Sequence, residues 1–166
     1  MNKEEIMNLA ARVADETMSM GYGGPFGAVI TDMDGNVIAT GSNRVIIDND
    51  PTAHGEIVCI RNACKKLNTH DLSGYVLYTT AYPCPMCLSA IMWANIKKVY
   101  YGCSVKDTRS IGFRDEFMYN FLDVLHNKPE EYLLGPNANV LSLQEVGKSS
   151  CKELFTKYES LKTKRY

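Results

Sequence analysis

The sequence predicts an α/β protein, a three-layer α/β/α sandwich built around a five-stranded mixed sheet. The chain has 166 residues, which is enough for one well-buried core and too few for two ordinary domains. Segments with helical periodicity alternate with short β-rich runs, and their order contains strand–helix–strand crossovers. We therefore expect a single domain over residues 1–166, with helices on both faces of the sheet.

The predicted elements follow the chain in order. Apolar residues recur at helical spacing over 6–18, and the glycines and proline at 21–25 end this first helix. Two β-rich runs follow at 26–31 and 36–40. The segment between them, 32–35, ends in an Asp-Gly step that suits a hairpin turn.

Two further helices are predicted to begin at prolines. The segment 50–52 (Asp-Pro-Thr) is typical of a helix start, with Asp50 or Thr52 as the cap of a helix that runs to about Leu67. The segment 83–85 (Pro-Cys-Pro) suits a second helix start, because proline is tolerated in the first turn and not in a helix interior. The predicted buried face of the first of these helices consists of Ile57, Ile60, Cys64 and Leu67.

The remaining elements vary in strength. The apolar run 75–79 has the pattern of a strand buried on both faces, and 98–102 predicts another strand. Helical patterns at 107–112 and 116–125 are weak and are followed by breakers. A fifth strand is expected at 140–143, with a last helix after it.

Composition excludes several classes of protein. Hydrophobic residues make up 45% of the chain and charged residues 22%, as in ordinary globular proteins, and the formal charge of −1 gives no basic footprint for nucleic acid. We interpret the basic stretch 148–165 as a solvated helix face. No apolar stretch approaches the length of a membrane span, and the acidic N-terminal segment does not resemble a signal peptide. Cytoplasmic residence is the default expectation, and there the six cysteines stay reduced, which favours metal binding over disulfides.

Two short stretches carry the predicted chemistry, 52–57 (Thr-Ala-His-Gly-Glu-Ile) and 82–87 (Tyr-Pro-Cys-Pro-Met-Cys). Taken alone, Cys84 and Cys87 are also typical of a buried reduced pair or a redox dithiol, and a lone His54 is more often a surface or core residue. Together, an upstream His-x-Glu and a Cys-x-x-Cys preceded by proline form the pattern of zinc nucleobase deaminases.

The number of ligands favours catalysis over a structural role for the metal. Three ligands, His54, Cys84 and Cys87, are what a catalytic zinc takes when its fourth position is left to water, whereas a structural zinc uses four. Glu56 is then the predicted acid–base residue. It takes a proton from the water, delivers it to a ring nitrogen as hydroxide adds to the amine-bearing carbon, and protonates the departing ammonia.

The same stretches resemble the cytidine deaminase superfamily of zinc-dependent nucleobase deaminases. The segments 51–54 (Pro-Thr-Ala-His), 88–91 (Leu-Ser-Ala-Ile) and 112–117 (Gly-Phe-Arg-Asp-Glu-Phe) are similar to its bacterial guanine deaminase branch, and the similarity covers nearly the whole chain. This resemblance implies a cytidine deaminase-like fold, one Zn²⁺ per active site, and conversion of free guanine to xanthine and ammonia. It also implies a homodimer in which the C-terminal segment, about 144–166, is exchanged with the partner subunit.

The resemblance implies roles for several residues beyond the metal ligands. Asn43 matches an asparagine that contacts the purine, and Asp115 matches an acid that contacts the base. Gly55 matches the residue whose backbone amide faces the substrate, and Tyr166 matches a terminal tyrosine that closes the partner's site. Phe26 is expected either to form a wall of the pocket or to belong to the core.

Three positions depart from the pattern of that branch. Gly55 stands where Ala is usual, Tyr82 replaces a Glu, and Arg114 replaces an Asp. The last two changes remove negative charge beside the pocket, so another aminated heterocycle, such as isoguanine, a pterin, a triazine or cytosine, stays open as the substrate. A tRNA adenosine deaminase, which shares the zinc motif, also stays open, although nucleic acid is not the expected partner. Outside enzymes, the alternative is a catalytically silent zinc fold that acts as a binding module.

Overall fold

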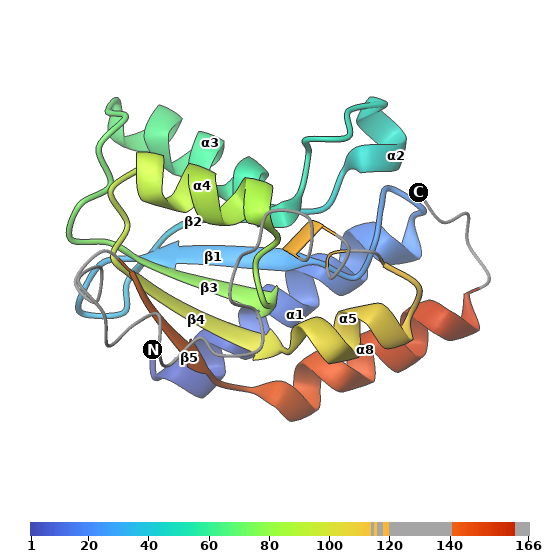
Figure 1. The fold of residues 1–166 in the computed structure, drawn as a ribbon. Helices are drawn as coiled ribbons and strands as arrows, with labels where there is room; N and C mark the ends of the chain where they lie inside the picture. The colour runs from blue at the N-terminus through green and yellow to red at the C-terminus, as the bar shows by residue number, and fades with distance from the viewer. Residues whose placement is uncertain (114, 116–117, 120–140, 162–166) are drawn as a thin grey trace.

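The computed structural model describes residues 1–113, 115, 118–119 and 141–161 (Figure 1). Tyr166, Arg114 and most of the weak helix predicted at 116–125 therefore lie outside the described residues. Within those ranges, no helix has both the length and the apolar character needed to cross a bilayer.

A five-stranded sheet forms the middle layer of the protein. Its strands are β1 (Gly27–Thr31), β2 (Val37–Ser42), β3 (Val76–Ala81), β4 (Lys98–Cys103) and β5 (Ser142–Glu145). They lie in the order β2-β1-β3-β4-β5; β1 is antiparallel to both of its neighbours, while β3, β4 and β5 are mutually parallel. The sheet is therefore mixed, as predicted.

Helices cover both faces of this sheet (Figure 1). On one face lie α3 (Gly55–Leu67) and α4 (Pro85–Trp93), and on the other lie α1 (Lys3–Ser19), α5 (Val105–Ser110) and α8 (Lys148–Ser160). The predicted three-layer sandwich is confirmed. The predicted end of the first helix is also confirmed, because Met20 caps α1.

The sheet separates two hydrophobic cores, because successive side chains on a strand point to opposite faces. Leu77 of β3 belongs to the core under α3 and α4, whereas Val76 and Tyr78 belong to the core under α1 and α8. β1 alternates in the same way and is buried along its whole length. The central strands therefore have little freedom to move, which makes them a rigid support for the residues of α3 and α4.

The start of α3 corrects one prediction. Neither Asp50 nor Thr52 caps the helix; the residue before the first turn is His54, and the first helical residue is Gly55. Asp50 and Thr52 instead form a local turn, in which the Asp50 carboxylate accepts hydrogen bonds from the Thr52 amide at 2.8 Å and from its hydroxyl at 2.7 Å. Aspartate and proline commonly form such turns, which the sequence does not separate from a cap.

The buried face of α3 also differs from the prediction, because the helix lies very close to β2. A Cβ atom on Gly41 would lie 2.3 Å from the backbone nitrogen of Cys59, so this approach requires glycine on the strand. Only small side chains fit beneath the helix, and Cys59 and Ala63 are both 0% exposed. The residues predicted for this face are only half-buried: Ile57, Ile60, Cys64 and Leu67.

Other element boundaries shift by a few residues. β2 continues to Ser42, and β5 begins at Ser142 instead of residue 140. The helix predicted at 107–112 is α5, whose N-cap Ser104 forms a reciprocal capping box. A four-residue helix, α2 (Val45–Asp48), was not predicted. Its shortness explains the omission, because four residues are too few to show helical periodicity.

The C-terminal elements pack against their own chain in this structure. β5 pairs with β4, and α8 contacts both α1 and β4. Cys151 of α8 lies against Gly102 of β4, where a Cβ would lie 2.2 Å from the Cys151 sulfur. Exchange of segment 144–166 between two subunits stays a prediction.

Candidate metal centre and active site

The predicted ligands stand at the starts of two helices. His54 is the N-cap residue of α3, and Cys84 is the N-cap residue of α4, with nearly equal backbone angles: φ −67° and ψ 155° for His54, φ −68° and ψ 167° for Cys84. Neither side chain caps its own helix. Both side chains are therefore free to turn toward the space between the helices, and the positive ends of the two helix dipoles meet there.

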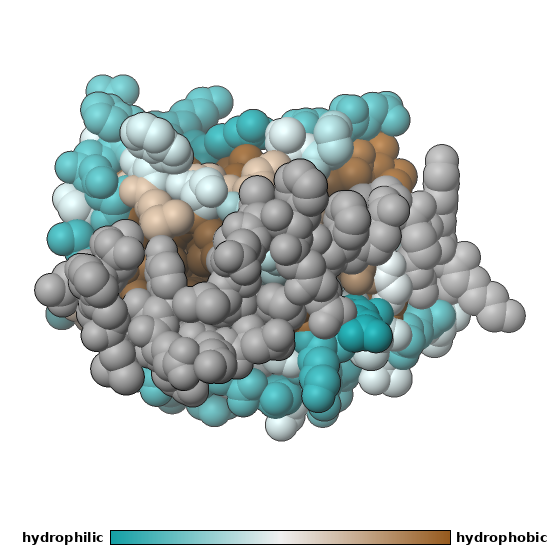
Figure 2. Space-filling model, viewed as in Figure 1, coloured by the Kyte–Doolittle hydropathy of each residue, from teal (hydrophilic) through white to brown (hydrophobic). Residues whose placement is uncertain are grey.

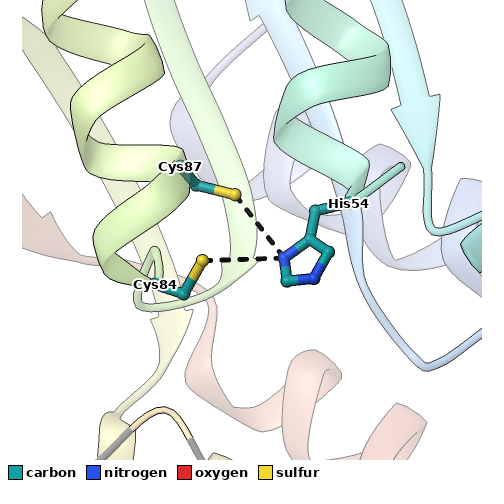
Figure 3. A group of neighbouring side chains, drawn as sticks. All are labelled: His54, Cys84 and Cys87. Carbon is teal, nitrogen blue, oxygen red and sulfur yellow. Dashed lines mark hydrogen bonds between the residues drawn. The ribbon is translucent and has the colours of Figure 1, made fainter. Parts of the chain in front are cut away.

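Cys87, one turn into α4, completes the group (Figure 3). The Nδ1 atom of His54 lies 3.6 Å from the sulfur of Cys84 and 3.6 Å from the sulfur of Cys87. All three ligand atoms lie within 4.8 Å of one another. The structure thus brings together the three ligands that the sequence predicts.

These distances fit zinc. With Zn–S of about 2.3 Å and Zn–N of about 2.0–2.1 Å, a tetrahedral ion separates its nitrogen and sulfur ligands by about 3.6 Å. Both nitrogen–sulfur distances in the protein have this value. One imidazole and two thiolates form a donor set that suits zinc. Known catalytic zinc sites include this combination of two cysteines and one histidine.

The side chains of His54, Cys84 and Cys87 shift one another's pKa values. A hydrogen bond with Cys87 and the neighbouring His54 lower the pKa of the Cys84 thiol to about 4, although burial opposes this shift. Burial by itself would lower the pKa of His54, but the Cys84 thiolate raises it to about 9. Because a metal binds thiolate and neutral imidazole, metal binding to these three groups releases protons.

Glu56 lies beside this centre and is 5% exposed. Its Oε1 atom accepts a hydrogen bond of 3.2 Å from the hydroxyl of Thr79 on β3. Burial raises the pKa of the Glu56 carboxyl, and the nearby His54 opposes this shift. A buried carboxyl group whose pKa is raised is suited to take and return a proton.

A cavity opens from the metal centre. Polar groups on its lining come from His54, Glu56, Cys84 and Asp115, and the remaining lining residues are Phe26, Ala81, Tyr82 and Phe113. Burial, together with the negative charges of Cys84 and Glu56, raises the pKa of Asp115 to about 7. Asp115 thus lines the same cavity as Glu56, while its contact with a base stays a prediction.

Aromatic rings form two walls of the cavity. The rings of Phe26 and Phe113 meet edge to face with centroids 4.8 Å apart. Tyr82 meets Tyr101 edge to face at 5.0 Å, and burial raises the pKa of Tyr82 to about 12, so its hydroxyl is neutral at pH 7. Phe26 is thus both a wall of the cavity and a contact of the core, since it also meets Phe155 at 5.7 Å.

Asn43 and Gly55 lie just outside the cavity lining. The Asn43 backbone amide donates to the Phe26 carbonyl at 2.8 Å, and its side-chain Oδ1 accepts from the Val45 amide at 3.1 Å. Asn43 is 0% exposed, and its side-chain Nδ2 has no partner among the described residues. A Cβ on Gly55 would lie 2.8 Å from the same Phe26 carbonyl oxygen, so glycine permits this close contact.

Sequence reasoning missed three residues around the site. Thr79 contacts Glu56, Phe113 lines the cavity, and Tyr119 donates a hydrogen bond to the Pro83 carbonyl just before Cys84. Phe113 belongs to the segment 112–117, which resembles guanine deaminases, so that resemblance is a signal for it. Thr79 and Tyr119 carry no local signal, because their contacts join segments far apart in the sequence.

Comparison with known proteins agrees with this geometry. Residues 1–103 match the cytidine and deoxycytidylate deaminase zinc-binding region. Guanine deaminase of Bacillus subtilis (strain 168) is 47% identical over 131 residues, which cover 79% of this chain and 81% of that protein. The solved structure of guanine deaminase from Bacillus subtilis superposes with a TM-score of 0.71, covering 100% of this chain and 99% of that one at 37% identity.

Two further relatives extend the comparison. The solved structure of a guanine deaminase from Nitrosomonas europaea superposes with a TM-score of 0.81, covering 96% of this chain and 85% of that one at 26% identity. The tRNA-specific adenosine deaminase of Haemophilus influenzae is 38% identical over 118 residues, which cover 71% of this chain and 68% of that protein. The chain is therefore similar in sequence to enzymes named for two different substrates, and similar in fold to guanine deaminases.

The metal site makes a direct prediction. Cys87→Ser removes one soft ligand, so we expect purified protein to hold well under half of the wild-type zinc content, measured by atomic emission or a chromogenic chelator. Cys59→Ser is the matched control. Like Cys87, Cys59 is fully buried, but it lies in α3, and its thiol donates to the Ala39 carbonyl, as a serine hydroxyl can. Loss of zinc from both variants, or from neither, would contradict the assignment of Cys87 as a ligand.

Proposed function

This chain belongs to the cytidine and deoxycytidylate deaminase family of zinc enzymes, and we propose that it hydrolyses guanine to xanthine and ammonia. It acts on a carbon–nitrogen bond, which is the reaction class of that family. The observation that carries the proposal is the placement of a buried acid, Glu56, in one cavity with His54 and Cys84 of the metal site. A silent zinc fold has no need of such an acid.

The residues of the chain have separate tasks in this reaction. When bound, zinc acidifies water for nucleophilic attack at neutral pH. Glu56 takes a proton from the attacking water and delivers it to the ring nitrogen next to the carbon under attack. It then carries the proton of the added hydroxyl to the amine, which leaves as ammonia when the carbon–nitrogen bond breaks and the carbon becomes a carbonyl. The aromatic walls at Phe26 and Phe113 hold a planar ring and keep bulk water away from it.

Recognition by this cavity fits a free base. A second acid, Asp115, faces the site, and no lysine or arginine is among the described residues that line it. Such a lining suits the N–H groups of guanine better than a phosphate, which favours lysine and arginine. We propose that Asp115 accepts hydrogen bonds from the base, that the unpartnered Asn43 Nδ2 donates to it, and that the Gly55 amide faces it.

Of the departures from the guanine deaminase pattern, Gly55 and Tyr82 lie within the described residues, and Tyr82 is the one that lines the cavity. It lines the cavity beside Cys84, with its ring held against Tyr101. A neutral phenol in place of a carboxylate removes one negative charge and leaves one hydroxyl. Other aminated heterocycles thus stay as alternative substrates, whereas a tRNA adenosine deaminase, favoured by the 38% identical relative, lacks support from the cavity lining.

The substrate proposal is tested by ammonia release. Zinc-loaded protein is incubated with guanine, isoguanine, cytosine, adenosine and an adenosine-containing tRNA anticodon stem-loop. We expect kcat/KM for guanine to exceed that for every other compound at least tenfold. A higher value for another free base would overturn the guanine assignment, and turnover of the stem-loop alone would favour the tRNA reading.

The role of Glu56 makes a second prediction. Glu56→Gln keeps the shape of the side chain and removes its acid–base function, so kcat should fall by about 10²–10⁴-fold while zinc content stays at the wild-type level. Glu153→Gln, on the distant exposed face of α8, should keep full activity. Wild-type turnover by Glu56→Gln would rule out the proposed proton transfer.

We also propose that the protein is a homodimer in a reducing cytoplasm. All six cysteines are free. Helix α4 contains no charged residue, and Met92 and Trp93 at its end are 40% and 86% exposed. Apolar residues reach the surface in this region and near α2 on the face shown in Figure 2. An exposed apolar end of a helix supports association with a second copy.

The dimer proposal predicts the mass in solution. Light scattering should give twice the 18.6 kDa of one chain for wild type. Trp93→Glu places a charge in the proposed contact and should shift the protein toward the monomer. Met33→Glu is the control, because Met33 is 66% exposed in the β1–β2 turn and should not affect association. A monomeric wild type, or equal effects of the two variants, would contradict this interface.

A further inference from the structure

A buried threonine on the central strand contacts the acid–base residue. β3 lies between β1 and β4, and Thr79 is paired with Ala28 on one side and with Tyr101 on the other. The alternation of side chains places Thr79 on the same face as Leu77, which is the face covered by α3. From there its hydroxyl donates to Oε1 of Glu56 at 3.2 Å.

Both partners in this contact are shielded from water. Thr79 is 1% exposed and Glu56 is 5% exposed. A buried carboxylate needs donors in place of water, and a hydrogen bond to a charged group is stronger than one between neutral groups. The contact therefore restricts the rotation of the carboxylate about its side-chain bonds.

The neighbouring residue, Thr80, makes different hydrogen bonds from those of Thr79. The Thr80 hydroxyl donates to the Pro25 carbonyl at 3.2 Å and accepts from the Gly27 amide at 3.1 Å. It therefore ties β3 to the start of β1 and does not contact Glu56. Among the described strand residues, Thr79 is the one whose side chain is seen to hydrogen-bond to Glu56.

We propose that Thr79 is a positioning residue that holds the Glu56 carboxylate in the orientation needed for proton transfer. This inference rests on the proposed deaminase function. Glu56 stands on the first turn of α3, where its long side chain by itself has several rotamers. The strand is fixed on both edges, so a donor on it gives the carboxylate one preferred direction. Proton transfer depends steeply on such placement.

The first test measures turnover of the zinc-loaded protein. Thr79→Val keeps the shape of the side chain and removes the donor, so kcat should fall about tenfold, with KM within twofold of wild type and zinc content unchanged. Thr79→Ser restores the hydroxyl and should recover at least half of the wild-type kcat. Thr31→Val is the matched control, because the Thr31 hydroxyl is buried on the sheet without a partner among the described residues.

Three results of this test would overturn the inference. They are a wild-type kcat in Thr79→Val, an equal loss in the Ser and Val variants, and a loss of zinc from Thr79→Val. The second of these would mean that shape and not the hydroxyl matters at this position.

A second measurement does not depend on activity. Thr79→Val should lower Tm by about 3 °C, because it leaves the buried carboxylate short of a donor. In a Glu56→Ala background the same change should leave Tm unchanged or raise it, because the hydroxyl then has no acceptor to lose. Equal shifts in the two backgrounds would overturn the coupling. If the coupling is present and wild type releases ammonia from no base, the deaminase proposal is wrong and the positioning of Glu56 stands.

Discussion

The close seating of α3 on the sheet sets the geometry on which the rest of the site depends. Gly41 allows the helix backbone to approach β2, and Gly55 allows the first turn to approach the Phe26 carbonyl. A side chain at either position would meet backbone atoms, which cannot rotate away. This approach brings Glu56 within hydrogen-bond distance of β3 and places a cavity wall beside the same turn. The acid and the wall are thus fixed by one packing contact.

The second requirement is that two helix starts meet. α3 follows an antiparallel hairpin and α4 follows the central strand, so the sheet order itself brings His54 and Cys84 to one end of the same face. Converging helix dipoles favour negative charge, and this stabilises the thiolate form that a metal binds. Neither ligand side chain caps the helix that it begins, so both helices lack the stabilisation that an N-cap hydrogen bond gives.

The sequence is sufficient for the metal ligands and for most of the architecture, because both rest on local patterns. The spacing of His54, Glu56, Cys84 and Cys87 predicts a metal site whatever the exact ends of the helices. Periodicity likewise identifies a strand or a helix even when its ends are misplaced by a few residues. The fully buried residues of α3 are Cys59 and Ala63 and not the predicted ones, three of which pack at the edge of this core, because burial there depends on Gly41, far away in the sequence. The role of Thr79 is not predictable from the sequence for the same reason. Its hydrogen bond to Glu56 joins a strand and a helix that come together only in the folded protein.

The position of His54 and Cys84 at uncapped helix ends has a consequence for the life of the protein in a cell. A bound ion ties the two helix starts to each other through His54, Cys84 and Cys87, so metal binding adds its free energy to the folded state. Chains that have not acquired metal should therefore open locally at these ends and meet proteases first. Supply of zinc would then set how much of this protein accumulates, as well as how fast each molecule works.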